Sequence, residues 1–419
     1  MSIPTLSPFA SGLKTETAFD VLALARGLQA KGKKVFELQI GDSPFNTPSH
    51  AVEAAIKAIR DGETHYCPST GIASFRETIA SFLSGEMGIT IGADEVVVAS
   101  GAKVFETFFC EAFLDHGDGV LVFSPYFPTY PPNIARRGAR MVTAPLRAER
   151  SFRPDPADVA KFLAEDPKPR AIFLNSPHNP TGGVATREDL EAIAKLIAGK
   201  DIALFSDEPY CHMVWEGEHV SPLQIPSIRQ QTVACYTFSK SYSMSGWRLG
   251  YAIAPPPIAS VISRMINTTS SCTPPIVQAA GQAALKHDKA ERERQMALFG
   301  GKVRLLCEKL KKVPGVTCEV PKGTFYVFPG VHAICENLKI TSHGLALYLL
   351  EAADDKVGLA CLGGECFGEA GMGFLRFSCA GSDEVLSGAI DFFADAITRT
   401  DRVAAFLKAR PEFQWKGTK

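Results

Sequence analysis

Two basic residues, Lys240 and Arg248, lie eight positions apart in a stretch rich in hydroxyl side chains. Apolar segments before and after it, Thr232–Tyr236 and Tyr251–Ala254, predict two buried strands. A lysine at the end of a buried strand is desolvated, which favours the neutral amine that can attack a carbonyl carbon. The guanidinium and the hydroxyls match the oxygens of a phosphate. The pattern indicates a site for a phosphorylated carbonyl compound such as pyridoxal phosphate (PLP), although a lone Ser-Lys pair would indicate only a basic surface turn.

The full string from Thr237 to Tyr251 is more specific. It reads close to S-x-S-K-x-x-x-x-x-G-x-R-x-G-Y, with Thr237 in the place of the first serine. This pattern resembles the Schiff-base segment of the aspartate aminotransferase family, the class I/II aminotransferases of PLP fold type I. The resemblance implies that Lys240 holds PLP as a Schiff base, and that Thr237, Ser239 and Arg248 contact the cofactor phosphate.

Asp207 follows another apolar segment, Ile202–Phe205, in the string Ser-Asp-Glu-Pro-Tyr. A buried carboxylate needs a partner, and a helix end or an arginine would serve as well as a ligand. The resemblance assigns Asp207 to the pyridinium nitrogen of PLP, whose protonated form makes the ring an electron sink. It assigns Tyr210 to the phenolic oxygen of the cofactor. Pro209 departs from the family, which usually has isoleucine or valine there.

Two loops carry further motifs. Asn175–Gly182 matches the family pattern N-x-P-x-N-P-T-G, although by itself it indicates only a turn-rich loop. The resemblance places Asn179 on the phenolic oxygen and on the substrate carboxylate. Phe127, in Ser-Pro-Tyr-Phe-Pro, matches the aromatic residue that stacks on the cofactor ring, and Tyr126 is the competing candidate for that position.

Arg376 lies within the apolar segment Gly373–Ser378, which predicts a strand. Fully buried arginines are rare unless they are paired, so a structural salt bridge is one interpretation. The resemblance gives the other interpretation, in which Arg376 clamps the substrate α-carboxylate with Gly41 beside it.

The turn Gly101-Ala102-Lys103 lies between a predicted strand, Val96–Ala99, and a predicted helix, Val104–Leu114. Backbone N–H groups at a helix N-terminus bind phosphate, although many such junctions bind nothing. The resemblance adds this turn to the phosphate site. Tyr66, which begins a Y-x-x-x-x-G string, is either an anchoring turn residue or, by resemblance, a residue that reaches the phosphate of a partner subunit. The second interpretation implies a homodimer with shared active sites.

The elements that must position these residues are strands that alternate with helices. Counting Val35–Ile40 as the first strand, Phe127 follows the third, Asn179 the fifth, Asp207 the sixth and Lys240 the seventh. Ligands of open α/β sheets bind beyond the carboxyl ends of the strands, so the candidate residues converge there. We expect an α/β fold with a mostly parallel, seven-stranded-type sheet covered by helices on both faces.

After about residue 285 the pattern changes to a smaller α+β domain. It begins with a long charged helix, Asp288–Lys312, and includes predicted strands at Gly323–Phe328 and Val357–Leu362. Near the other end of the chain, Thr47 and Pro48 predict the N-cap and first residue of a helix. In the family the N-terminal arm packs with the C-terminal third. We therefore expect an arm and part of the small domain at 1–48, a large PLP-binding domain at 49–287, and the rest of the small domain at 288–419.

Composition limits the function classes. The chain has 419 residues and a net charge of −1, so no basic field is present to recruit nucleic acid. We find neither a membrane-spanning run nor a signal peptide nor a metal-ligand cluster. The eleven cysteines, without a Cys-x-x-Cys pair, are typical of reduced core residues and predict a cytoplasmic protein.

The resemblance implies a PLP-dependent aminotransferase that moves an amino group from an amino acid to a 2-oxo acid in two half-reactions. The amine of Lys240 would move the proton from the substrate Cα. One alternative is another PLP reaction on the same fold, such as that of a C–S β-lyase. A second alternative is a PLP-sensing regulatory protein, which needs a DNA-binding module that this sequence has no spare segment to form.

Overall fold

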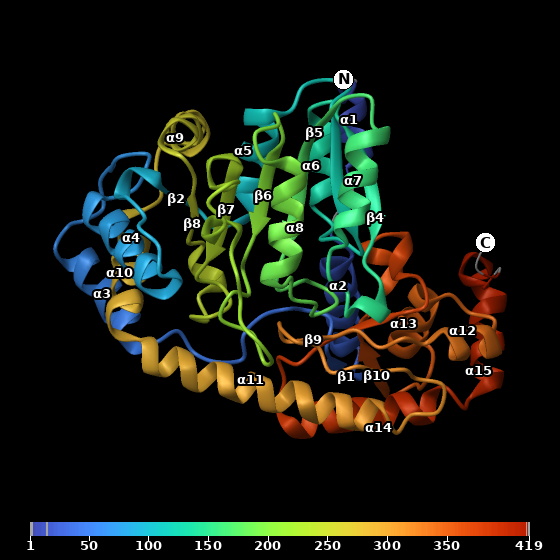
Figure 1. Cartoon of the computed structure of the whole chain (residues 1–419). Coiled ribbons are helices and arrows are strands. Elements are labelled where there is room, and N and C mark those ends of the chain that lie inside the picture. The colour runs from blue at the N-terminus through green and yellow to red at the C-terminus, as the bar shows by residue number, and fades with distance from the viewer. Residues whose placement is uncertain (1–2, 14–15, 416, 418–419) are drawn as a thin grey trace.

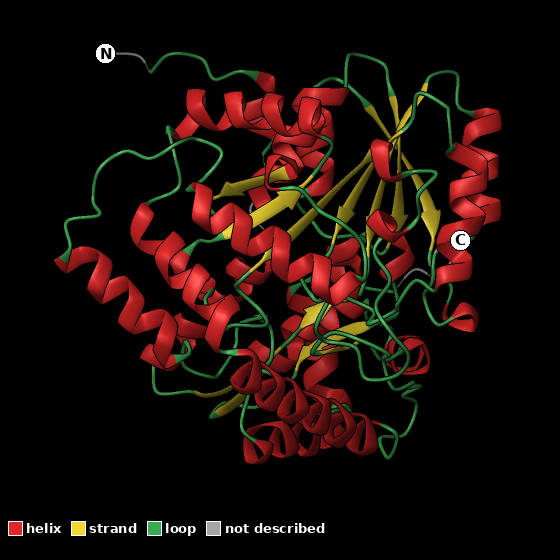
Figure 2. Ribbon diagram, turned by 60° about the vertical axis from the view of Figure 1, so that its left-hand side comes forward, coloured by secondary structure: helices red, strands yellow, loops and turns green. Residues whose placement is uncertain are grey.

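The computed structural model describes residues 3–13, 16–415 and 417. Its main feature is a seven-stranded sheet in the order β2-β8-β7-β6-β5-β3-β4, seen as the central fan of arrows in Figures 1 and 2. Neighbouring strands are parallel, except that β8 runs antiparallel to β2 and to β7. The strands are β2 Val96–Ala99, β3 Gly119–Ser124, β4 Arg140–Pro145, β5 Pro169–Asn175, β6 Ala203–Asp207, β7 Thr232–Thr237 and β8 Gly250–Ile253. The expected mostly parallel sheet is confirmed.

Helices cover both faces of this sheet. Successive residues of a strand point to opposite faces. Along β3, Val120 and Val122 belong to a core cluster with residues of α5, α6 and α9, whereas Leu121 and Phe123 belong to another cluster with residues of α7 and α8. Burial on both faces explains why the strands are almost uninterrupted apolar runs. These helices are α5 Lys103–Phe113, α6 Tyr130–Arg136, α7 Pro156–Glu165, α8 Arg187–Ile197 and α9 Pro256–Ser270.

Three more helices, α3 Ser49–Arg60, α4 Ala73–Met87 and α10 Pro275–His287, pack on the end of the sheet that β2, β8 and β7 form. The predicted start of α3 is wrong by one residue. Pro48 occupies the N-cap position, so Ser49 is the first helical residue. The hydroxyl of Thr47 donates to the carbonyl of Ser243 at 2.9 Å, and its oxygen accepts from Trp247 Nε1 at 3.0 Å instead of from the first N–H groups of the helix.

The smaller part of the fold contains two short sheets. One pairs β1 Lys34–Glu37 with β10 Val357–Ala360 in parallel, and the other has the antiparallel order β11-β12-β9. The strands of the second sheet are β9 Tyr326–Val327, β11 Leu362–Gly363 and β12 Leu375–Ser378. The helices are α11 Lys289–Leu310, α12 His332–Leu338, α13 Ser342–Glu351, α14 Asp383–Ala396 and α15 Thr400–Ala409. As Figure 1 shows, α11 runs along one edge of the molecule, from the large sheet to this smaller part.

The first strand does not belong to the large sheet, so that expectation was wrong. β1 is only partly buried, and its residue Lys34 pairs with Val357 of β10. The expected strand at 357–362 is in fact two strands, β10 and β11, which belong to different sheets. The expected strand at 323–328 shortens to the two residues of β9.

The N-terminal arm packs with the C-terminal part of the chain. It contains α1 Pro8–Gly12 and α2 Thr17–Ala30. Val21 and Ala25 of α2 belong to a core cluster with Leu350 of α13 and Phe367, and Leu38 lies in a second cluster with residues of α11, α13 and α14. These contacts support the division that we propose, in which 1–48 and 288–419 form a small domain around the large domain of 49–287.

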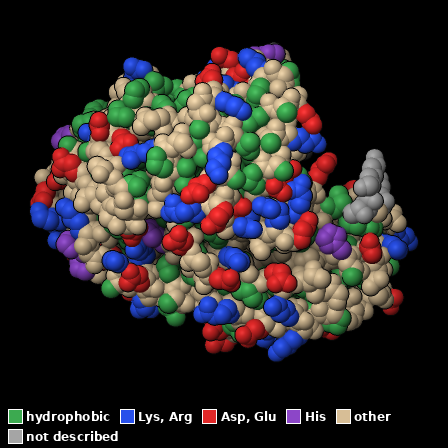
Figure 3. All heavy atoms as spheres, viewed as in Figure 1, with side chains coloured by type: hydrophobic (Ala, Val, Ile, Leu, Met, Phe, Trp, Pro, Cys, Tyr) green, Lys and Arg blue, Asp and Glu red, His purple; other side chains and the backbone are tan. Residues whose placement is uncertain are grey.

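Charges of both signs are interspersed over the face that Figure 3 shows, in keeping with the net charge of −1. Within the described part of the chain, no helix combines the length and the apolar character that crossing a bilayer requires.

Candidate active site

A cleft of about 540 Å³ opens at the carboxyl ends of β5, β6 and β7, where the smaller part of the fold meets the large sheet. Residues from the arm, from the large sheet and from β9 and β12 line it together. Twelve of the residues singled out in the sequence line this cleft: Gly41, Ala102, Lys103, Phe127, Asn179, Asp207, Tyr210, Thr237, Ser239, Lys240, Arg248 and Arg376. Gly101 does not line the cleft but lies next to the guanidinium of Arg248, which does. Tyr66 lies outside the cleft, with 89% of its surface exposed.

Lys240 lies in the loop that follows β7 and extends toward the arm. Its Nζ donates a hydrogen bond of 2.6 Å to the carbonyl of Gly41. The flanking aromatic residues Phe238 and Tyr242 are buried, and the Tyr242 N–H bonds to the Phe238 carbonyl, which holds the loop in place. No described carboxylate forms an ion pair with Lys240, so its amine is free to react with a ligand.

Asp207 ends β6 with only 7% of its surface exposed. Its Oδ2 accepts a hydrogen bond of 2.6 Å from the Tyr130 hydroxyl, and its Oδ1 accepts one of 3.3 Å from the Cys235 thiol. Burial raises the pKa of the Asp207 carboxyl, and these hydrogen bonds act in the opposite direction. Among the described residues no cation pairs with it. A buried carboxylate that has neutral donors and no cation is suited to a protonated ring nitrogen.

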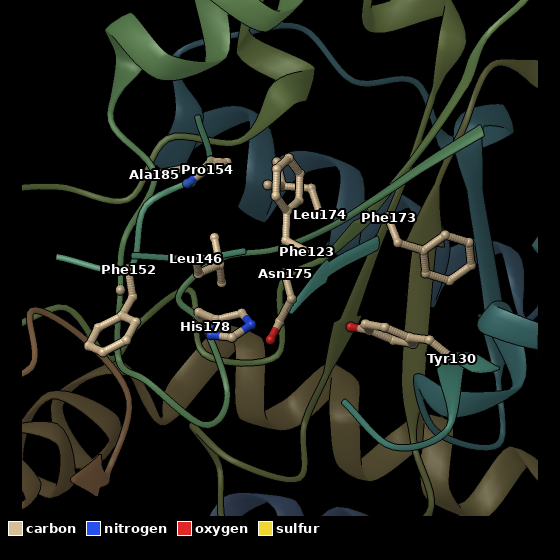
Figure 4. A pocket seen from close by; sticks show the side chains of 11 residues that line it. Phe123, Tyr130, Leu146, Phe152, Pro154, Phe173, Leu174, Asn175, His178 and Ala185 are labelled. Atoms are coloured by element: carbon tan, nitrogen blue, oxygen red, sulfur yellow. The ribbon is translucent and has the colours of Figure 1, made fainter. Parts of the chain in front are cut away.

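Tyr130 and Asn175 line the small pocket drawn in Figure 4, and Asn175 also lines the cleft. The figure shows the Tyr130 hydroxyl pointing toward Asn175 at the end of β5. The Asn175 side chain donates to the backbone carbonyl of Asp207 at 2.8 Å, and its oxygen accepts from the N–H of Asn179. The loop that carries Asn179 is thereby fixed to the end of β6.

Tyr210 and Tyr326 form the floor of the cleft beside Gly41. Their hydroxyls lie 3.2 Å apart. Burial raises the pKa of the Tyr210 hydroxyl well above its usual value, so at neutral pH it stays protonated and can donate a hydrogen bond. A Cβ at position 41 would come within 1.6 Å of the Tyr326 hydroxyl, so this close approach requires glycine.

Arg376 of β12 is 4% exposed. Its guanidinium donates to Asn179 Oδ1 at 3.0 Å and to the Gln39 carbonyl at 2.6 Å, and it lies 4.3 Å from the centre of the Tyr326 ring. Its Nε has no hydrogen-bond partner. No described carboxylate pairs with Arg376, so the structural salt bridge considered from the sequence is not formed. A buried guanidinium without a counter-ion, open to a cleft, is suited to an external carboxylate.

Backbone N–H groups, two hydroxyls and the Arg248 guanidinium lie close together near the start of α5. Ala102 caps this helix without a side-chain hydrogen bond, which leaves its first N–H groups available. A Cβ at Gly101 would come within 2.3 Å of an Arg248 terminal nitrogen, so the turn and the guanidinium are in close contact. The hydroxyls of Thr237 and Ser239 lie 2.8 Å apart beside them. This set can hold a phosphate.

Several cleft residues were not predicted from the sequence. Glu16 of the arm pairs with Lys103, whose ammonium lies 5.3 Å from the centre of the Phe127 ring. Glu106 is buried, accepts hydrogen bonds from Thr129 and Asn133 at 2.5 and 3.2 Å, and also lines the cleft. Burial, together with nearby Asp207, raises the pKa of Glu106 well above its usual value. The sequence signal for Glu106 was limited to the presence of an acidic residue in the predicted helix Val104–Leu114.

The cleft of this α/β fold brings together unpaired donors near the start of α5, a buried carboxylate without a cation, a lysine amine without an acidic partner and a buried guanidinium. Residues 33–393 match the family model described as aminotransferase class I and II. The chain belongs to this family.

Curated relatives agree over nearly the whole chain. A probable aspartate/prephenate aminotransferase of Aquifex aeolicus is 37% identical over 90% of this chain and 94% of its own length. An arginine–pyruvate transaminase of Pseudomonas aeruginosa is 32% identical over 86% of this chain and 89% of its own length. The solved structure of Thermus thermophilus aspartate aminotransferase with maleate is 33% identical, with a TM-score of 0.87 over 94% of this chain and 100% of that one.

These findings favour amino-group transfer over the C–S lyase and regulatory alternatives. The chain is an aminotransferase, an enzyme that moves an amino group between an amino acid and a 2-oxo acid. The relatives are named for different amino acids, so membership of the family does not define the side chain that this enzyme accepts.

Proposed function

We propose that this aminotransferase binds PLP in the cleft and works through Lys240 by a ping-pong reaction. The observation that carries the proposal is the buried Asp207 carboxylate, which has two neutral donors and no cation in the described protein, in the same cleft as the unpaired amine of Lys240. When bound, PLP supplies a carbonyl carbon for the amine and a ring that accepts electrons. The residues present fit each part of that molecule.

The phosphate would be held by the N–H groups at the start of α5, by the hydroxyls of Thr237 and Ser239, and by Arg248. Asp207 would keep the ring nitrogen protonated, because a buried carboxylate favours a cation next to it. Tyr130 and Cys235 hold the two carboxylate oxygens of Asp207 in place. Phe127 would stack on the ring.

Tyr210 and Asn179 would donate hydrogen bonds to the phenolic oxygen. Asn179 is oriented by its contact with Arg376, so one side chain connects the cofactor end of the cleft with its carboxylate end. Arg376 would bind the substrate α-carboxylate, and Gly41 leaves the space for it beside Tyr326. The substrate is thereby held at one fixed end.

Lys240 would transfer the proton. Once the substrate amino group has displaced Nζ from the carbonyl carbon that PLP supplies, the freed Nζ would take the proton from the substrate Cα and deliver it to that carbon. The carbonyl of Gly41, which now accepts from Nζ, would orient this amine.

A panel of amino donors, each with 2-oxoglutarate and with pyruvate as acceptor, tests the proposal. At least one pair should give the oxo acid of the donor and the amino acid of the acceptor in equal amounts. Release of ammonia or of a thiol in place of the second amino acid would overturn it in favour of a lyase.

We further propose a cytoplasmic homodimer with shared active sites. The eleven cysteines are all unpaired, which supports a reducing compartment. The 89% exposure of Tyr66, a large aromatic residue next to the half-buried Cys67, supports an interface at this loop.

Tyr66→Phe is expected to weaken PLP binding by about tenfold, because one hydrogen bond to a charged phosphate is lost. Equilibrium dialysis of PLP with wild type and variant measures this change, and sedimentation gives the oligomeric state. A wild-type protein that is monomeric and fully active would contradict the shared site.

A further inference from the structure

The ion pair between Glu16 and Lys103 closes one side of the cleft. Glu16 precedes α2, and Lys103 is the first residue of α5, so the pair joins the N-terminal arm to the large sheet. Both residues line the cleft that contains Lys240 and Arg376. The Lys103 ammonium also lies over the ring of Phe127, which lines the same cleft.

Four cationic side chains line the cleft in the described structure: Lys103, Lys240, Arg248 and Arg376. The proposed function uses Lys240 for the amine, Arg248 for the phosphate and Arg376 for the α-carboxylate. Lys103 is then the cation left to meet a second carboxylate at the end of a substrate side chain.

Glu16 neutralises that remaining cation. A second acid, Glu106, is 2% exposed and accepts its hydrogen bonds from Thr129 and Asn133, and no ion pair joins it to Lys103 in the described structure. Glu16 is therefore the acid that pairs directly with Lys103. Its side chain is 18% exposed and that of Lys103 45%, so the pair is partly shielded from water and salt.

Glu16 is also held in place by its neighbours. Its carbonyl accepts the N–H of Phe19 at 2.9 Å at the start of α2. That helix is anchored by Val21 and Ala25, which are buried against the C-terminal part of the chain. Because Glu16 lies directly before this anchored helix, its carboxylate loses little conformational freedom when it pairs with Lys103. A substrate carboxylate must therefore compete with a well-placed partner.

We propose that Glu16 is a specificity-determining residue, which holds Lys103 and excludes amino acids with a carboxylate at the end of their side chain. A second substrate carboxylate would have to displace Glu16 and then lie next to its negative charge. The substrate class of this enzyme is amino acids with uncharged or cationic side chains. This inference rests on the proposed function and defines the donor that it uses.

The experiment compares near-isosteric donors that differ in one charge, aspartate with asparagine and glutamate with glutamine. The measured quantity is the ratio of kcat/KM for the acid to kcat/KM for its amide, so changes common to both donors cancel. The variants are Glu16→Gln, Lys103→Met and the double variant Glu16→Gln/Lys103→Met. Glu53→Gln, an exposed site on α3 outside the cleft, controls for net charge.

In wild type and in Glu53→Gln the acid-to-amide ratio is expected to be about 0.1 or lower, because the acid meets Glu16. Glu16→Gln raises the ratio by about tenfold or more, since Lys103 is then free to bind the second carboxylate. In the Lys103→Met background, adding Glu16→Gln should leave the acid-to-amide ratio unchanged, because Lys103 is no longer there to bind the second carboxylate.

A wild-type ratio of one or more overturns the inference, as does a ratio that Glu16→Gln leaves unchanged. A gain that survives in the double variant also overturns it, because Lys103 would then not be the latent site. The inference is also overturned if no variant accepts aspartate or glutamate, because removal of Glu16 should allow these donors to bind. If no donor of the wider panel is turned over, the proposed function fails instead.

Discussion

Lys240→Ala is expected to bind PLP and yet to lose on the order of 10⁴-fold or more in kcat, because both the covalent link and the proton carrier are removed. The phosphate donors and Asp207 remain, so equilibrium dialysis should still detect bound cofactor. Steady-state kinetics with the best donor of the panel measures the loss.

Lys195→Ala is the matched control, since Lys195 is an exposed lysine of α8 that does not line the cleft. It should keep wild-type activity. A Lys240→Ala enzyme that turns over at a rate within tenfold of wild type would show that another amine carries the chemistry.

Arg376→Leu is expected to lose about 10²–10⁴-fold in kcat/KM for all amino acid donors alike, because each carries the same α-carboxylate and a desolvated charge pair loses one partner. Amines that lack a carboxylate should lose much less. The melting temperature should fall little, because the substitution leaves no described carboxylate unpaired and removes only the hydrogen bonds of Arg376 to Asn179 and to the Gln39 carbonyl.

Arg292→Leu provides the contrast. Arg292 is also buried, but it pairs with Glu86 at 2.9 Å and donates to Tyr242 outside the cleft. Its loss should lower the melting temperature, because Glu86 is left without this partner. If Arg376→Leu behaves like Arg292→Leu, or harms carboxylate-free amines equally, then Arg376 is structural and the carboxylate site lies elsewhere.

The large sheet was predictable because its strands are local apolar runs. β2 is buried at every residue, and its run of three valines before a glycine turn is typical of a short buried strand. The smaller sheets were less predictable, because their strands depend on distant partners. β1 pairs with β10, more than 300 residues away, and an apolar run does not specify which strand it will meet.

The candidate site shows the same division. Lys240, Asp207 and Asn179 were predictable, because polar residues at the ends of apolar strands converge at one edge of a parallel sheet. Cys235 was missed, because its contact with Asp207 depends on the register between β6 and β7. Glu16 was missed because its contact depends on where the arm packs.

Reduction of the holoenzyme with borohydride tests directly whether Lys240 carries the cofactor. The treatment converts a lysine-linked cofactor into a stable amine, and peptide mass spectrometry then locates it. We expect a single modified peptide that contains Lys240, and no such label in Lys240→Ala. A label on a different lysine, or bound PLP that attaches to no lysine, would show that Lys240 does not hold the cofactor.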